Sequence, residues 1–342
     1  MTVTMAFIAR RSNVSPATVS RVLRGKGAGF ISAETRGRVL EVAAQLGYVP
    51  ARGGTGKVAE RMGVVAAWIR NPNAPFYAGI VRLLQRRAAA EGSDLILSGF
   101  IDEGGEPDFE HGLPRAVNPG VWRVDGIIGV DCPQRVRAYL KRAQARGRAA
   151  GVVAAGSEGI EGLDCVTFDP HVGAEAATQH LLKCGRKRIV HLTGASSIES
   201  VRLAREESYV RVMGAAGLEP RVIRARDETR GAGRACIREV IGRGENFDAV
   251  FCLNDDLAIG AYRGLRDEGR CVPVDVAMVG YDSIEDTEYL DVPLTSVWQD
   301  PEVLVSKAWE LLWRRIAEPQ SETVSVVLAP KLVVRESCGG AS

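Results

Sequence analysis

The chain has 342 residues, of which 46% are hydrophobic, so it is long enough for two or three domains with sizeable cores. No apolar run approaches the ~20 residues of a membrane-spanning helix, and the start of the chain lacks the pattern of an export signal, so we expect it to remain in the cytoplasm. The cysteines are scattered without a Cys-x-x-Cys pair, which favours reduced, mostly buried thiols over disulfides.

Charge is distributed unevenly along the chain. Residues 1–62 carry ten Lys or Arg and three Asp or Glu, a net charge of +7. Of the 44 basic and 42 acidic residues in the whole chain, 34 and 39 therefore remain in the rest, a net charge of −5. A cationic head on an anionic body is expected where only the head contacts phosphate, so these charges predict a nucleic-acid partner for the head.

The first fifty residues predict a bundle of short helices. Thr4 can cap a first helix over residues 5–11, Ser15 can cap a second, and Ser32 can cap a third over about residues 33–46. The side chains expected to point inward recur at helical spacing: Met5, Ile8 and Ala9, then Val19, Val22 and Leu23, then Val39, Leu40, Val42, Ala43 and Leu46.

The second helix is expected to begin at Pro16, where the missing N–H costs nothing, and its outer face carries small side chains and one arginine. Such a face can enter the major groove of DNA, where Arg21 can donate two hydrogen bonds to a guanine edge. The expected DNA contacts are Thr4, Ser15, Pro16, Ala17, Thr18, Ser20, Arg21, Arg24 and Lys26. The alternative is a helical bundle that contacts only other proteins.

A linker should follow the head, because residues 48–62 are rich in glycine and include Pro50. It is basic because it carries Arg52, Lys57 and Arg61. From residue 63 onward, short apolar runs alternate with amphipathic helical stretches, as in parallel sheets covered by helices. The expected strands span 62–69, 94–98, 126–130, 151–155, 165–168, 188–193, 221–225, 249–253 and 276–281. The expected helices span 77–91, 134–146, 170–184, 205–216, 231–242, 256–268 and 301–316. A glycine-rich break at 157–164 suggests two doubly wound lobes.

Several motifs resemble the LacI (lactose repressor) family of bacterial regulators. They include Val14-Ser15-x-Ala17-Thr18-Val19-Ser20-Arg21-Val22-Leu23 in the head, and Asn254-Asp255-Asp256 and Val279-Gly280-Tyr281-Asp282 in the body. The resemblance implies a small all-α helix-turn-helix head and an α/β, two-lobed body similar to periplasmic sugar-binding proteins, with two doubly wound parallel sheets.

The resemblance also implies domain limits. The DNA-binding head would span 1–47 and the hinge linker 48–62, with an effector-binding and dimerisation domain over 63–342. The N-lobe would comprise about 63–161 and 294–322, and the C-lobe about 162–293 and 323–338. In the family the hinge folds on DNA and inserts a leucine into the minor groove; this linker has no leucine, so either the operator bends less or another side chain substitutes.

In such lobes, ligands lie beyond the carboxyl ends of the strands. Arg205 resembles the arginine with which the family grips its ligand, and Arg202 is the alternative if the register differs. Asn254 and Asp282 follow apolar runs and could bind hydroxyl groups. Two aromatic side chains could stack on a sugar face. The expected effector contacts are Phe76, Arg205, Asn254, Asp282 and Trp298. Alternatively, Asp255 and Asp282 cap helices, and the aromatic residues pack between the lobes.

The resemblance implies a homodimeric, ligand-responsive regulator that binds double-stranded operator DNA. We expect it to repress carbohydrate-related genes and to bind a sugar-like effector between its lobes. We expect no catalytic residues, cofactor or metal, because the four histidines lack a paired ligand spacing and no nucleophile motif is present. The alternative is a sugar-binding protein or sugar-converting enzyme that shares the fold of the body without binding an operator.

Overall fold

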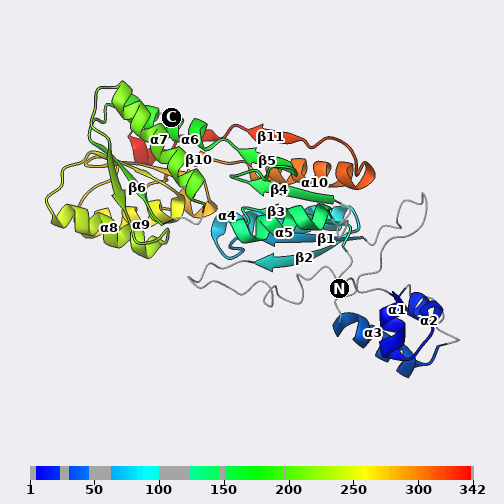
Figure 1. Ribbon diagram of the computed structural model, residues 1–342. Coiled ribbons are helices and arrows are strands. Elements are labelled where there is room, and N and C mark those ends of the chain that lie inside the picture. Colours follow the sequence, from blue (N-terminus) through cyan, green and yellow to red (C-terminus); the bar gives the residue numbers. More distant parts are fainter. Residues whose placement is uncertain are drawn as a thin grey trace.

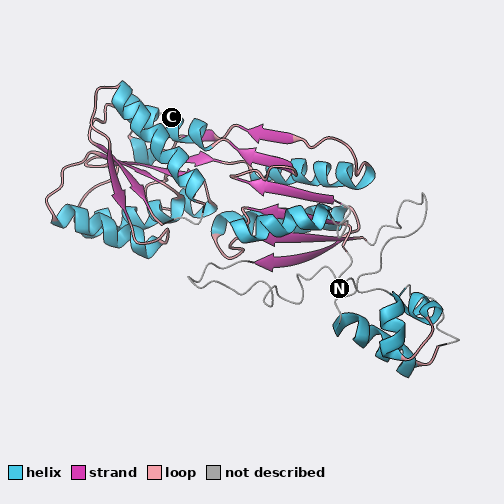
Figure 2. Cartoon of the chain, in the orientation of Figure 1, coloured by secondary structure: helices cyan, strands magenta, loops and turns pink. Residues whose placement is uncertain are grey.

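The computed structural model describes residues 5–23, 31–45, 63–99, 124–145, 151–195 and 198–339. The predictions for the linker at 48–62 and for Thr4, Arg24 and Lys26 lie outside the described residues. Figures 1 and 2 show the helical head and the two lobes of the body, each with a sheet between helices. Among the described residues, no helix combines the length and apolarity needed to cross a membrane.

The described part of the head contains the predicted helices α1 (Met5–Ser12), α2 (Pro16–Leu23) and α3 (Ala33–Gln45). Asn13 joins α1 to α2 with a φ of 52°, a backbone conformation that asparagine tolerates better than most residues. The buried core consists of Ile8, Ala9, Val19, Val22, Val39 and Ala43.

Two side chains that were expected in the core of the head are exposed. Met5 is 36% exposed because it lies at the very start of α1, ahead of the buried residues of that helix. Leu40 is 47% exposed because it follows the buried Val39 by one residue, which rotates it about 100° around the helix. The inward face of α3 is therefore narrower than its apolar sequence suggested.

The first lobe contains a six-stranded parallel sheet with the strand order β11-β5-β4-β3-β1-β2. Helices α4 and α10 pack on one face, and α5 packs on the other. Its elements are β1 (Val64–Ile69), α4 (Pro75–Ala90), β2 (Asp94–Gly99), β3 (Gly126–Val130), α5 (Gln134–Ala145), β4 (Gly151–Gly156), β5 (Asp164–Phe168), α10 (Pro301–Ala317) and β11 (Ser325–Leu328).

The second lobe has the strand order β12-β10-β9-β8-β6-β7, and β12 is its one antiparallel strand in the described structure. Helices α8 and α9 cover one face, and α6 and α7 cover the other. Its elements are α6 (Pro170–Lys183), β6 (Ile189–Thr193), α7 (Glu199–Ala215), β7 (Arg221–Arg224), α8 (Arg230–Gly242), β8 (Ala249–Cys252), α9 (Asp255–Asp267), β9 (Ala277–Asp282), the 3-10 helix η2 (Glu285–Glu288), β10 (Thr295–Trp298), β12 (Lys331–Val333) and the 3-10 helix η3 (Glu336–Cys338).

The prediction of two doubly wound lobes is confirmed, but the predicted limits between them are wrong. Strand β5 pairs with β4 and belongs to the first lobe, although it follows the break at 157–164. Strand β10 pairs with β9 in the second lobe, although we expected residues 294–322 in the first. Strand β11 pairs with β5 in the first lobe, although we expected residues 323–338 in the second. An apolar run predicts a strand but not its partner, because the strands of both sheets bury the same kinds of residue.

A buried ion pair fixes α10 to β5 in the first lobe. The Arg315 Nε donates to Asp164 Oδ2 at 2.7 Å, and Arg315 Nη2 donates to Asp164 Oδ1 at 3.1 Å. Both side chains are almost fully buried. Two parallel charge-assisted hydrogen bonds in this setting hold the helix in one position along the strand.

Candidate functional site

The outer face of α2 is open for binding. The Ser15 Oγ accepts a hydrogen bond from the Thr18 backbone N–H at 3.1 Å, which confirms the predicted helix cap. Pro16, Ala17 and Arg21 are exposed, while Thr18 and Ser20 are half-buried. Within the described residues, the Arg21 guanidinium makes no ion pair. Of the predicted DNA contacts that the structure describes, Ser15, Pro16, Ala17 and Arg21 are therefore exposed, and Thr18 and Ser20 are partly so.

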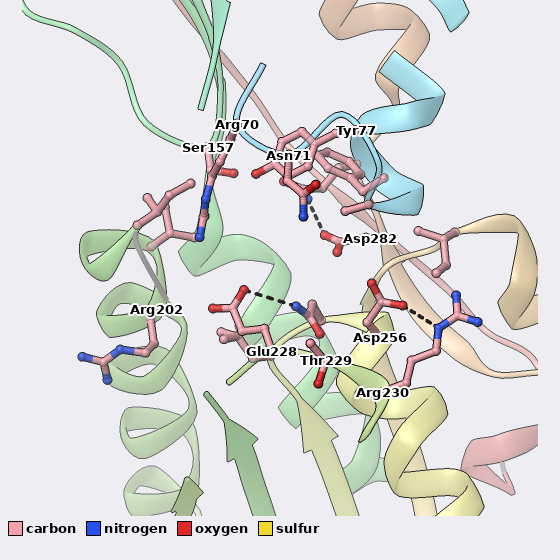
Figure 3. A pocket seen from close by; sticks show the side chains of 18 of the residues that line it. Arg70, Asn71, Tyr77, Ser157, Arg202, Glu228, Thr229, Arg230, Asp256 and Asp282 are labelled. Atoms are coloured by element: carbon pink, nitrogen blue, oxygen red, sulfur yellow. Dashed lines mark hydrogen bonds and ion pairs between the residues drawn. The ribbon is translucent and has the colours of Figure 1, made fainter. Parts of the chain in front are cut away.

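A second candidate site is a cavity of about 690 Å³ between the lobes, at the carboxyl ends of their strands. Figure 3 shows side chains from both lobes pointing into it. Charged and polar side chains line it beside apolar ones such as Ile198 and Leu253. The lining includes Arg70, Asn71, Asn73, Phe76, Tyr77 and Ser157 from the first lobe, and Arg202, Arg205, Glu228, Thr229, Arg230, Asn254, Asp256 and Asp282 from the second, together with Gln299 between the lobes.

Arg205 is held rigidly in the wall of the second lobe. Its side chain is only 6% exposed, and its Nη1 donates to the Leu253 carbonyl at 2.6 Å. Its guanidinium carbon lies 3.5 Å from the centre of the Tyr281 ring, so the planar group stacks on the aromatic face. The buried Nε has no hydrogen-bond partner among the described residues. A guanidinium fixed in this way is suited to donate to ligand oxygens.

Asp282 closes the cavity at the end of β9. Its Oδ1 accepts a hydrogen bond from Gln299 Nε2 at 2.9 Å. Burial raises the pKa of Asp282 well above its usual range, and the positive charge of Arg205 partly opposes this rise. The backbone has a φ of 109° at Asp282 and 52° at Ser283, so a strained turn presents the carboxyl group to the cavity.

The neighbouring Asp255 supports that turn rather than contacting the cavity. Its Oδ2 accepts from the Ile284 N–H at 2.9 Å, and its Oδ1 accepts from the Ser296 hydroxyl at 2.7 Å. Burial raises the pKa of Asp255 to about 7. Asn254, not Asp255, caps α9, because its Oδ1 accepts from the Leu257 N–H at 2.9 Å. Asn254 therefore has both a structural role and a place in the cavity wall.

The wall of the first lobe is built around the ends of β1, β3 and β4. The Tyr77 hydroxyl donates to Asp131 Oδ2 at 3.0 Å, and Asp131 Oδ1 accepts from the Ser157 N–H at 2.6 Å. Gly156 has a φ of 117°, and a Cβ there would lie 2.3 Å from Asp131 Oδ1. Glycine at this position thus makes room for the carboxylate that positions Tyr77 and Ser157.

Four of the predicted effector contacts line the cavity, namely Phe76, Arg205, Asn254 and Asp282. Trp298 does not line it, so our expectation that Trp298 stacks on the ligand is not retained. Gln299, the next residue, lines the cavity instead. Arg202 also lines it, with its guanidinium 3.4 Å from Glu199 and 3.2 Å from Glu206.

Other lining residues were missed at the sequence level. Arg70, Ser157 and Gln299 each follow a strand directly, so the same strand-end argument could have identified them. The loop before α8 contributes Glu228 and Thr229, and no sequence signal marked this loop.

The sequence of this chain is similar to those of known regulators over nearly its whole length. Residues 4–51 match the family model of bacterial regulatory proteins of the lacI family, and residues 178–338 match that of the periplasmic binding protein-like domain. The HTH-type transcriptional regulator CelR of Thermobifida fusca is 32% identical, over 98% of each chain. The ribose operon repressor of Haemophilus influenzae is 28% identical, also over 98% of each chain.

A solved structure of a transcriptional regulator CelR-cellobiose complex has a TM-score of 0.68 and 30% identity, and the match covers 98% of this chain and 100% of that one. The fold and the two sites define a DNA-binding transcription regulator with a ligand-binding body. The chain belongs to the LacI family of bacterial regulatory proteins.

Proposed function

We propose that this regulator is a homodimeric repressor whose operator binding is controlled by a saccharide or saccharide derivative in the cavity between its lobes. The observation that carries the proposal is the composition of that cavity, in which guanidinium, carboxyl and amide groups from the two lobes line a single volume. About 690 Å³ is an ordinary size for a small-molecule site. Paired donors and acceptors of this kind bind adjacent hydroxyl groups.

Coupling between the two sites follows from the position of the cavity. A ligand that contacts Arg70 on one lobe and Arg205 on the other stabilises one relative placement of the lobes, because it binds that placement more tightly than others. The lobe arrangement then controls how the two heads of a dimer meet two half-sites of DNA. A coupling free energy of about 1 to 3 kcal/mol would change operator affinity by roughly 5- to 150-fold.

Support for a sugar effector comes from relatives. The CelR structure at 30% identity is a cellobiose complex, and the ribose operon repressor is a further relative by sequence. The effector contacts are Phe76, Arg205, Asn254 and Asp282, to which the cavity lining adds Arg70 and Gln299. The DNA contacts are those of the α2 face, and the protein acts in the cytoplasm, where its operator lies.

DNA binding is tested with purified protein and DNA from upstream of its own gene. We expect a retarded complex whose affinity falls steeply as salt rises, because lysine and arginine displace counterions from phosphate. A thermal-shift screen of neutral sugars, sugar acids and sugar phosphates then identifies the effector, since a ligand bound only by the folded state raises the melting temperature.

These two experiments also distinguish a regulator from a sugar-converting enzyme and from a sugar-binding protein. An effector that shifts operator affinity without being consumed supports the proposal. Turnover of a sugar by a protein that binds no DNA would identify a sugar-converting enzyme with this fold, and sugar binding without either activity would identify a binding protein.

A further inference from the structure

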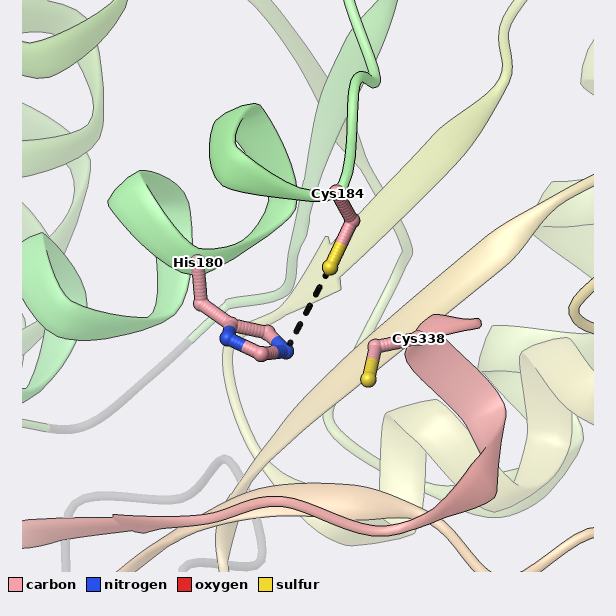
Figure 4. Close-up of side chains that lie close together, drawn as sticks. All are labelled: His180, Cys184 and Cys338. Carbon is pink, nitrogen blue, oxygen red and sulfur yellow. Dashed lines mark hydrogen bonds between the residues drawn. The ribbon is translucent and has the colours of Figure 1, made fainter. Parts of the chain in front are cut away.

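A cluster of soft metal ligands lies in the second lobe, formed by His180, Cys184 and Cys338. His180 is on the last turn of α6, Cys184 is the C-cap residue of that helix, and Cys338 ends η3. One ligand atom from each residue lies within 4.8 Å of the other two. Figure 4 shows the imidazole and both sulfur atoms pointing toward one another. Within the described residues, no other group of three such ligands was found.

The spacing of this cluster matches tetrahedral coordination. With metal–sulfur bonds of about 2.3 Å and metal–nitrogen bonds of about 2.0 to 2.1 Å, tetrahedral ligands lie about 3.6 Å apart for nitrogen and sulfur and about 3.8 Å apart for two sulfurs. His180 Nε2 and Cys184 Sγ are 3.6 Å apart. The other two distances are at most 4.8 Å, so they need to shorten by no more than about 1.2 Å to reach tetrahedral values.

The surroundings suit thiolate ligands. A divalent cation and two thiolates have no net charge, and Lys183 and Arg186 lie close enough to interact electrostatically with His180 and Cys184, respectively. A bound divalent cation deprotonates a coordinating thiol, so both cysteines would bind it as thiolates.

We propose that His180, Cys184 and Cys338 bind a thiophilic divalent cation such as Zn²⁺. His180 and Cys184 are half-buried, so water has access to the fourth position, whereas Cys338 is fully buried. The four-residue spacing of His180 and Cys184 places both ligands on one side of α6. The third ligand comes from the end of the described chain, so the cation joins α6 to a segment that is distant in sequence.

The same segment supports the turn beside the effector cavity. Arg335, three residues before Cys338, donates to the Ser283 hydroxyl at 3.1 Å and to the Leu294 carbonyl at 2.7 Å. In the metal-free chain Cys338 donates its S–H to the Arg335 carbonyl, with the atoms 3.4 Å apart, and a metal-bound thiolate gives up this contact while η3 stays attached to Arg335 through the backbone. Metal binding would therefore fix the segment from Arg335 to Cys338, which contacts Ser283 next to Asp282. We expect the bound metal to stabilise the second lobe.

The test uses the full chain, reduced and free of metal. Titration with Co²⁺ reports sulfur ligands through a thiolate charge-transfer band and tetrahedral geometry through intense visible bands, and competition with Zn²⁺ and a chelator gives the zinc affinity. We expect one high-affinity ion per chain and a higher melting temperature with zinc. His180→Gln and Cys184→Ser should each weaken zinc binding by at least about tenfold and abolish the thermal shift, because even indirect changes around metal ligands cost 10- to 100-fold.

Cys271→Ser is the matched control, because Cys271 is an exposed thiol outside the cluster and its loss should leave zinc binding unchanged. Cys338→Ser alone would not decide the question, since loss of this fully buried thiol can weaken folding directly. Equal zinc affinity in the parent chain, His180→Gln and Cys184→Ser would overturn the proposal. So would a Cys184–Cys338 disulfide in protein isolated under reducing conditions, with no sulfur–cobalt band.

Discussion

Replacing His191 by phenylalanine tests whether this buried histidine makes the free energy of unfolding depend on pH. His191 lies on β6 and is fully buried. Its Nδ1 is 3.0 Å from the Phe251 carbonyl, so it carries the proton and donates, while the buried Nε2 has no hydrogen-bond partner among the described residues. The ring stacks on Phe251 with the centroids 4.7 Å apart. A phenyl ring keeps this stacking and removes the titratable group.

Burial lowers the pKa of His191 from 6.5 to about 4, and the positive charge of Arg205 acts in the same direction. A tenfold change in proton affinity is worth about 1.4 kcal/mol, so this difference corresponds to about 3 kcal/mol. Below pH 6.5 the unfolded chain binds a proton at this position, whereas the folded chain does so only below about pH 4. His191 therefore makes the free energy of unfolding fall as pH decreases across this window.

Denaturant unfolding of the full chain at about pH 7 and about pH 4, followed by circular dichroism, measures this effect. We expect the parent chain to lose about 3 kcal/mol more than His191→Phe between the two pH values, because the other titrating groups are common to both proteins. His171→Gln is the control, because it removes an exposed histidine rather than a buried one. Equal losses in the parent chain and His191→Phe would refute the reasoning and show that His191 gains its proton while still folded.

Three further substitutions, with one control, address the two sites and the fold. Arg21→Ala should reduce the preference for operator over unrelated DNA by roughly 10- to 100-fold, since a bidentate base contact is worth about 1 to 3 kcal/mol. Fluorescence anisotropy measures this, and an accompanying loss of effector affinity would argue against a role confined to DNA. Arg205→Lys should weaken the effector by roughly 10- to 100-fold in calorimetric titration, because lysine lacks the planar fork, while operator affinity without effector should not change. Arg315→Met should cost about 3 to 5 kcal/mol of unfolding free energy, because it leaves Asp164 buried without its main partner. Arg243→Met at an exposed pair should cost less than about 1 kcal/mol, and similar losses in both variants would contradict the importance of burial.

Short-range physical chemistry made much of this protein readable from its sequence. Ser15 caps α2 through a contact three residues away, and the inward face of α2 follows from side chains three and four positions apart. The apolar runs located most of the strands because a buried parallel strand requires continuous apolar residues. Because ligands lie beyond strand ends, the apolar runs also predicted two cavity residues, Asn254 and Asp282. The resemblance to the family predicted the third, Arg205.

The tertiary structure decided what depends on contacts between distant residues. The sequence marked β5, β10 and β11 as apolar segments or left them unassigned, but only strand pairing placed each in its lobe. Likewise, no local pattern indicated that Cys338 approaches His180. Helix and strand formation rest on interactions within a few residues, whereas strand order and converging side chains depend on how whole layers pack. The sequence therefore determined the elements and their exposed faces, and packing determined which faces meet.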